Sequence, residues 1–221
     1  MGPTASLVAA AAIAAAALPS LAAAACAGTP TYRVTCRFNW TPSTHPRSYV
    51  PSAHFSPVTV AAHTPAYTMW LTNALATRGM KNVAETGSRG ALRFELATYQ
   101  RAGHVASVAA GRPGPVFPTS TRVVTVTMDG PAGATLLSAS TMLVPSPDWF
   151  LGWSRVDLCN GTAWTDAAGG LGLWDAGTYS GATLTGADKE TVPPTVIRRF
   201  GFGDYPLFGR EFGTWSAKRV V

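Results

Sequence analysis

The sequence carries little charge, and its first part carries none. Lys, Arg, Asp and Glu make up 13% of the 221 residues, and none of them precedes Arg33. Residues 1–25 are mostly alanine and end in small residues, which is typical of a cleaved secretory signal peptide, although a basic residue near the start is missing. Pro19-Ser20 interrupts the run and alanine is a weak membrane anchor, so we expect export rather than a membrane span. The exported domain then covers residues 26–221.

Acidic residues are scarcer than basic ones. The chain has 17 Lys and Arg against 11 Asp and Glu, a formal net charge of +6, and all of this excess belongs to the exported part. A basic domain attracts acidic partners such as sulfated polysaccharides or anionic lipid headgroups, although the charge also serves solubility alone. Apart from Arg198-Arg199 and Lys218-Arg219 the basic residues are scattered, and no Lys/Arg-rich helix occurs. We therefore expect no nucleic-acid partner.

Cysteine is also rare, with three in the chain. In an oxidising compartment two of them can pair. Cys36 alternates with Tyr32 and Val34 on the apolar side of a strand-like segment, which predicts a buried strand position and leaves Cys26 and Cys159 to pair. The string Ala23-Ala24-Ala25-Cys26 is also similar to a bacterial lipoprotein cleavage box. A lipidated Cys26 could form no disulfide.

Short segments rich in β-branched and aromatic residues recur along the chain, separated by turn clusters. About eight strands at this spacing predict an all-β fold, an antiparallel β-sandwich. Two helical patterns, at 69–86 and 91–101, add one or two short helices, and 129–133 is typical of a hairpin connection. The segments expected as strands are 31–40, 55–62, 104–110, 122–128, 135–144, 149–156, 195–200 and 215–221.

The motifs of common catalytic sites are missing. Residues 177–181 have the serine of Gly-x-Ser-x-Gly one place late, and 170–172 lack the third glycine of a nucleotide-binding loop. We expect a binding module rather than an enzyme, with a secreted hydrolase on a sandwich scaffold as the alternative. His45, His54 and His63 recur every nine residues, but prolines interrupt the chain between them. We expect three separate histidines rather than a zinc site.

Two aspartates stand at sharp corners of the predicted strands. Asp148 follows Pro-Ser-Pro and Asp175 precedes Ala-Gly, so each lies where backbone carbonyls are free to point at a cation. Calcium takes about six to eight oxygen ligands, mixed from carboxylates, carbonyls and water. We predict a metal site at Asp148 and Asp175, the alternative being that each caps its own turn. Asp129 lies roughly 30 Å away at the other end of a strand and is expected to be a turn residue.

Several strings of this chain resemble one known family. In chain order they are the segments 32–35 and 53–57, Pro-Ser-Pro-Asp-Trp ending at Trp149, and Trp-Asp-Ala-Gly-Thr ending at Thr178. The family has these strings in the same order. Together they resemble the spondin domain, of the F-spondin and mindin type, over residues 30–181. The resemblance implies a C2-like β-sandwich, which agrees with the sandwich predicted from the strand pattern.

The resemblance implies a secreted adhesion or matrix-binding module. Its partner would be an extracellular matrix or cell-surface protein or a glycan, including acidic polysaccharide. It implies calcium or another divalent metal at Asp148 and Asp175, and a disulfide between Cys26 and Cys159 that would hold the loop beside Asp148. F-spondin-like sequences carry a further acid where this chain has Tyr179, so we expect weak calcium binding. In a bacterium, export would lead to the periplasm or cell envelope, where a lipid-anchored structural protein is the alternative.

Overall fold

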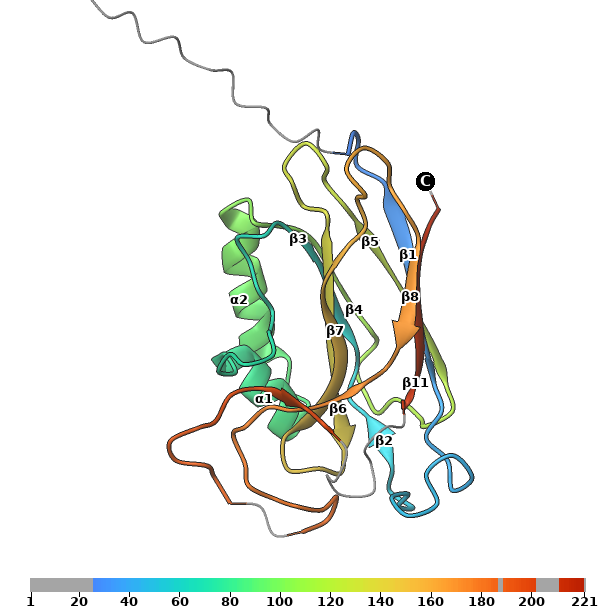
Figure 1. Cartoon of the computed structure of the whole chain (residues 1–221), viewed down its shortest axis with the longest axis vertical. Coiled ribbons are helices and arrows are strands. Elements are labelled where there is room, and N and C mark those ends of the chain that lie inside the picture. The colour runs from blue at the N-terminus through green and yellow to red at the C-terminus, as the bar shows by residue number, and fades with distance from the viewer. Residues whose placement is uncertain (1–25, 187–188, 202–210, 221) are drawn as a thin grey trace, which may run out of the picture.

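Two antiparallel β-sheets face each other in the computed structural model, which describes residues 26–186, 189–201 and 211–220 (Figure 1). Two helices, α1 (Arg78–Thr86) and α2 (Gly90–Arg101), lie beside the larger sheet. The predicted all-β antiparallel sandwich with short helices is confirmed. The predicted signal peptide, residues 1–25, lies outside the described residues.

The smaller sheet is exposed on one side. Its strand order is β5 (Thr121–Thr127), β1 (Thr31–Phe38), β11 (Gly213–Arg219) and β8 (Ala167–Gly170), all antiparallel. Buried positions in β1 alternate with partly or fully exposed ones, because only one face of the sheet is covered. Cys36 is on the buried face, as predicted, and is free.

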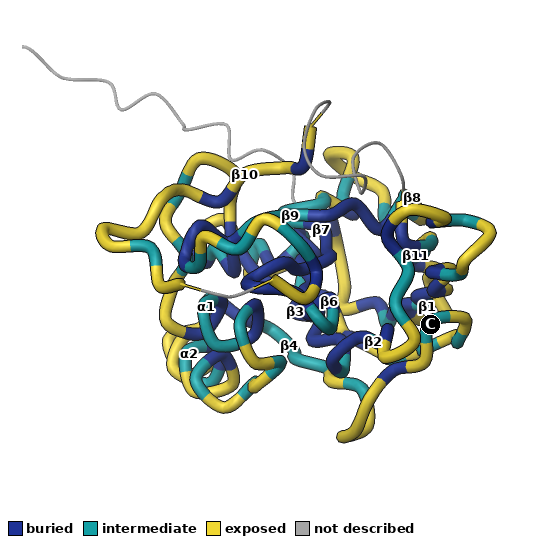
Figure 2. Tube along the Cα trace, turned by 90° about the horizontal axis from the view of Figure 1, so that it is seen from below, coloured by how far each residue is buried: buried dark blue, intermediate teal, exposed yellow. Residues whose placement is uncertain are grey.

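The larger sheet is covered on both sides at its centre. Its order is β10 (Arg198–Arg199), β9 (Leu173–Asp175), β7 (Trp149–Asp157), β6 (Leu136–Val144), β3 (Thr59–His63) and β4 (Val105–Ala110), with β2 (His54–Phe55) added to β6. Nearly all of β6 and the first half of β7 are buried, because the smaller sheet packs on one face and the helices on the other (Figure 2).

Aromatic side chains fill the space between the sheets. Trp153 of β7 stacks on Trp215 of β11 with ring centroids 4.2 Å apart, and Phe38 of β1 stacks on Phe55 of β2 at 4.4 Å. Each large apolar side chain buried in this way stabilises the fold by about 1.5–3 kcal/mol. A second cluster joins the helices to the larger sheet, and in it Trp70 meets Phe150 edge to face.

Helix α1 begins at a cap built from two elements. Thr77 is the N-cap, and its hydroxyl accepts a hydrogen bond from the Met80 amide. Glu95 of α2 accepts from the Gly79 amide at 2.7 Å and from the Thr77 hydroxyl at 2.9 Å. These bonds satisfy groups that the start of a helix leaves without partners, and they hold α1 against α2.

The predicted helix at 69–86 is wrong in its first half, since only α1 is helical. Asn73 has a left-handed backbone with φ 65° and the chain around it forms turns. Met69 and Trp70 are nevertheless buried under the helices. The apolar residues of this segment are therefore spaced as in a helix, although the segment forms turns.

The strand predictions also need correction. The strand expected at 55–62 is divided into β2 and β3. The 129–133 segment is a tight turn that passes from β5 in one sheet to β6 in the other, so it is not a hairpin. Within 195–200 only the two residues of β10 are paired. Strands β8 and β9 were not predicted, because β8 is Ala-Ala-Gly-Gly, a composition of low strand propensity, and β9 has three residues.

A disulfide joins Cys26 to Cys159 and confirms the predicted pairing. It takes up the thiol that lipidation of Cys26 would need, which counts against a lipid-anchored protein. The expectation that it holds the loop beside Asp148 is wrong. Asp148 precedes β7 and Cys159 follows it, so this nine-residue strand separates them by roughly 30 Å.

Candidate metal site

The turn between β6 and β7 places Asp148. The peptide bond before Pro145 is cis, and Ser146 closes the turn: its hydroxyl donates to the Leu143 carbonyl at 2.6 Å and accepts from the Trp149 amide at 3.1 Å. Because β7 starts at the buried Trp149, the preceding residue is carried inward. Asp148 is fully buried.

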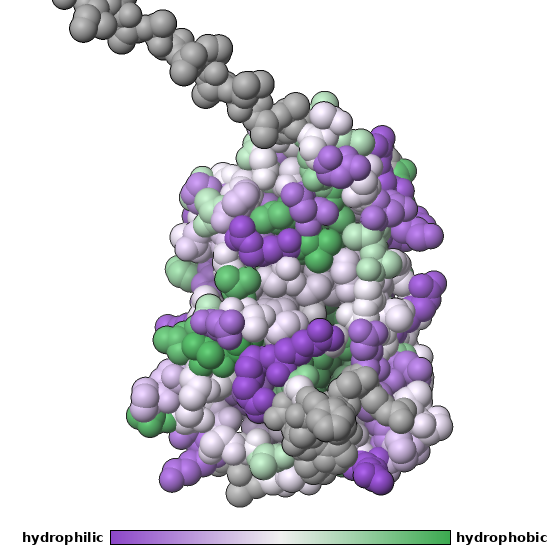
Figure 3. Space-filling model, in the orientation of Figure 1, coloured by the Kyte–Doolittle hydropathy of each residue, from purple (hydrophilic) through white to green (hydrophobic). Residues whose placement is uncertain are grey.

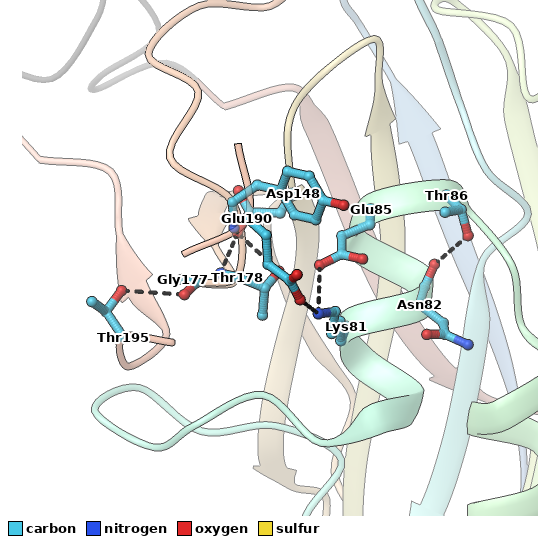
Figure 4. Close-up of polar contacts among 10 residues, drawn as sticks. Lys81, Asn82, Glu85, Thr86, Asp148, Gly177, Thr178, Glu190 and Thr195 are labelled. Carbon is cyan, nitrogen blue, oxygen red and sulfur yellow. Dashed lines mark hydrogen bonds and ion pairs between the residues drawn. The ribbon is translucent and has the colours of Figure 1, made fainter. Parts of the chain in front are cut away.

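The two oxygens of the Asp148 carboxylate have different surroundings. Oδ2 accepts hydrogen bonds from the Thr178 amide at 2.7 Å, the Thr178 hydroxyl at 3.2 Å and the Tyr179 amide at 3.0 Å (Figure 4). Oδ1 is buried too, but no described residue donates to it. A buried carboxylate oxygen without a donor costs free energy, so a cation at Oδ1 would be stabilising.

Asp175 is the neighbour of Asp148 across the sheet, because it lies directly opposite Trp149 in the pairing of β9 with β7. Its Oδ1 accepts from the Gly177 amide at 2.7 Å. Its Oδ2 lies 3.0 Å from Nη2 of Arg198 on β10. Asp175 therefore caps its own turn and already has a cationic partner from the protein.

The turn after Asp175 depends on a glycine. Gly177 has φ 73°, and a Cβ at this position would collide with the Thr195 carbonyl oxygen. The Thr195 amide donates to the Gly177 carbonyl at 2.8 Å. The Thr195 hydroxyl donates to the same carbonyl at 3.4 Å (Figure 4). This close approach folds the turn so that the next two amides, those of Thr178 and Tyr179, point at Asp148.

Burial raises the pKa of Asp148 to about 6. Removal from water is the largest cause and the negative charge of Asp175 adds to it, while the hydrogen bonds from Thr178 and Tyr179 lower the pKa. The ionised carboxylate is thus disfavoured unless a positive charge compensates it. A proton does so at low pH, and a metal cation would do so at neutral pH.

The other acids near the site are paired with Lys81 of α1. Its Nζ lies 2.6 Å from Glu190 Oε1 and 3.7 Å from Glu85 Oε1 (Figure 4). Tyr179, which stands where a third acid was expected, pairs its backbone with Glu190. Within the described ranges no three His, Cys, Asp or Glu side chains are grouped so that they could hold a metal ion. A cation beside the two aspartates would need backbone carbonyls and water to complete its ligands.

Asp129 is a turn residue, as predicted. Its Oδ1 accepts a hydrogen bond from the Ala132 amide at 3.1 Å. It precedes β6, whereas Asp148 follows that strand, so the two acids lie at opposite ends of the sandwich.

The three regularly spaced histidines have separate partners. His45 stacks on Phe212 with centroids 4.4 Å apart, and His54 donates from Nδ1 to a backbone carbonyl. His63 is buried; its Nδ1 donates to a carbonyl at 2.9 Å and its Nε2 accepts from the Ser138 hydroxyl at 2.8 Å. Burial lowers the pKa of His63, which favours the neutral ring. These contacts fit structural roles.

Known proteins match this chain over most of its length. The family Spondin_N matches residues 30–204. The chain belongs to the spondin family. Human Spondin-2 is 33% identical to it over 170 residues, which cover 75% of the chain and 51% of that protein. Mouse Spondin-1 is 34% identical over 194 residues, which cover 85% of the chain and 24% of that protein.

The chain thus spans about half the length of Spondin-2 and about a quarter of Spondin-1. Spondins are secreted extracellular matrix proteins, so membership of the family indicates that this spondin-type chain is secreted and extracellular. Of the described helices, none is both long and apolar enough to cross a membrane.

Two cations at the site were not predicted. Arg198 was noticed only as part of a basic pair, and its strand of two residues is too short to be found from sequence. Lys81 lies on α1, and nothing in its local sequence indicates that it meets Glu190 109 residues later. Arg198 and Asp175 come together because β10 pairs with β9, which only the folded structure shows.

Proposed function

We propose that this chain is an extracellular adhesion module that binds a matrix or cell-surface partner and holds calcium weakly at Asp148 and Asp175. Membership of the spondin family supports the adhesion role. The observation that most supports the cation is Asp148 Oδ1, which is buried without a donor among the described residues, next to a second carboxylate.

The two aspartates fit a weakly bound cation. Asp148 Oδ1 would be one ligand and the Asp175 carboxylate the other anionic one. Arg198 opposes tight binding, because its guanidinium neutralises Asp175 in the absence of metal. Extracellular calcium modules work with dissociation constants of about 10⁻⁴ to 10⁻³ M, so a site of two carboxylates can still be filled outside a cell.

A cation here would stabilise the loop that follows β9. The amides of Thr178 and Tyr179 already hold this loop to Asp148, and the Thr191 amide donates to the Thr178 carbonyl at 2.9 Å. Glu190 ties the same loop to Lys81 of α1. A cation would keep Asp148 ionised, and the ionised carboxylate is the stronger acceptor for these amides, so calcium would organise a surface loop for a binding partner.

Calorimetric titration with calcium tests the cation. Wild type should release or absorb measurable heat and saturate in the millimolar range, whereas Asp148→Asn should give no binding heat. Asp129→Asn is the matched control: it removes one negative charge at the other end of β6 and should bind like wild type. A wild type without binding heat, or an Asp148→Asn variant that binds normally, would end the calcium proposal.

The adhesion role is tested separately. Purified wild type should bind immobilised extracellular matrix or cell surfaces, and a broad esterase, glycosidase and protease screen should stay silent. Turnover in that screen would instead support the secreted hydrolase. Failure to bind any matrix or cell-surface preparation, with and without calcium, would contradict the adhesion role.

A further inference from the structure

The outward side of the smaller sheet carries cations and hydroxyl groups. Along β5, β1 and β11 the side chains that point away from the core are polar with one exception, Val123. We call this set the basic face; its members are Thr121, Val123, Thr125, Thr127, Thr31, Arg33, Thr35, Arg37, Thr214, Ser216 and Lys218.

Like charges lie directly opposite each other on the basic face. Arg33 of β1 is the register partner of Lys218 of β11, which places their Cβ atoms about 4.5–5.5 Å apart. Arg37 follows on the same side of β1, roughly 13 Å from Arg33. Both members of the opposed pair are exposed, and the described part of the chain contains no ion pair to any of the three. Such a pair is repulsive unless an anion lies between its members.

Acids border the basic face without entering it. The strands β5, β1 and β11 contain no Asp or Glu. Asp166 lies near one end, where it accepts a hydrogen bond from the Arg219 amide at 2.9 Å. Glu211 lies at the other end, where its carboxylate covers Gly170 of β8. The cations between these ends are therefore not neutralised by side chains on their own strands.

The chemistry of the basic face suits a linear sulfated sugar polymer. Guanidinium groups bind sulfate-like oxyanions through paired hydrogen bonds, and the Thr and Ser hydroxyls offer donors and acceptors to sugar hydroxyls. A lipid surface fits less well, because Val123 is the single apolar side chain of the set. Figure 3 shows hydrophilic side chains projecting along the right-hand margin, on the side where Figure 1 has β1, β8 and β11.

We propose that the basic face binds a sulfated polysaccharide, with sulfate groups at Arg33, Lys218 and Arg37. This inference rests on the proposed function, because it names by chemical class the matrix partner of the module. It does not depend on calcium, since the basic face belongs to the smaller sheet and the two aspartates to the larger one.

Binding to immobilised heparin in the presence of a calcium chelator tests the proposal. Wild type should bind, and its affinity should fall steeply as salt rises, because binding displaces counterions from the polymer. The double variant Arg33→Thr, Lys218→Thr should bind at least roughly tenfold more weakly at physiological salt. Melting curves measured without polymer should show it folded, at or above the wild-type midpoint, since a repulsive pair is removed. If it does not fold, the single variant Arg33→Thr takes its place.

The matched control removes the same charge elsewhere. Arg47→Gln with Arg93→Gln changes two exposed arginines outside the smaller sheet and should bind within about twofold of wild type. Equal losses in both double variants would mean attraction by net charge alone and would overturn the proposal. Wild type that binds matrix but not heparin would overturn it while leaving the adhesion role standing, and binding to phosphatidylserine vesicles in place of heparin would also overturn it.

Discussion

Asp148 is an acid buried with one oxygen fully hydrogen-bonded and the other without a described donor. Its pKa of about 6 lies above the ordinary value of 3.8. Keeping it ionised at neutral pH then costs the folded state roughly 3 kcal/mol in the absence of a compensating cation. That cost is large against the total stability of a typical domain. At this residue, the proposed calcium site and the stability of the calcium-free fold therefore oppose each other.

Asp148→Asn should reveal this opposition in calcium-free buffer. An acid whose pKa is higher in the folded state binds its proton more tightly there, so its contribution to stability is full below about pH 4 and is lost as pH rises to about 6. The asparagine variant should thus be at least as stable as wild type at pH 7.5, and the difference should disappear near pH 4. Urea denaturation across this range measures it. Wild type being the more stable at pH 7.5 without calcium would refute the explanation.

At the scale of elements, the strongly patterned strands were predictable and the weakly patterned ones were not. Buried and exposed residues alternate along β1 because one face of its sheet is covered. β6 and β7 contain apolar runs because both faces of their sheet are covered. The strands beside the candidate site, β9 and β10, are too short to carry a period. The two aspartates were correctly expected to lie together, whereas Arg198 could not be expected there.

Gly152 marks a close contact between β6 and β7. A Cβ at this position would collide with the Ala139 carbonyl oxygen on the neighbouring strand. We expect Gly152→Ala to destabilise the fold by about 1–3 kcal/mol, because the central strands of the larger sheet must separate. Urea denaturation measures the change. Gly111→Ala is the control, since its nearest neighbour would be an ordinary contact at 3.6 Å; equal stability changes in both variants would contradict the account.

At the scale of the whole molecule, the disulfide, the candidate metal site and the basic face lie in separate places. The disulfide closes the sandwich at one end of β7, and the candidate metal site lies at the other. The larger sheet carries the aspartates, and the smaller sheet carries the basic face on its open side. Both the disulfide and the sandwich followed from sequence patterns, and the strand expected at 149–156 already separates Asp148 from Cys159.

Loss of the disulfide should destabilise the whole sandwich. The disulfide closes a loop of 133 residues and lowers the conformational entropy of the unfolded chain. The double variant Cys26→Ser, Cys159→Ser should therefore lose up to about 4–5 kcal/mol of stability on the chain-entropy model. Reductant should lower the wild-type melting temperature and leave the double variant unchanged. Burial raises the pKa of Cys36 to about 12, so this thiol should react with a thiol reagent only after unfolding. An unchanged melting temperature in reductant would contradict the prediction.

Melting curves with and without calcium are the sharpest test of a cation that compensates Asp148 and Asp175. In about 10 mM calcium, the wild-type melting temperature should rise by about 3–10 °C relative to chelator, as expected for a millimolar to submillimolar site on a domain of this size. The Asp148→Asn variant should not shift. A wild-type melting temperature that calcium leaves unchanged, or an equal shift in the variant, would contradict the claim.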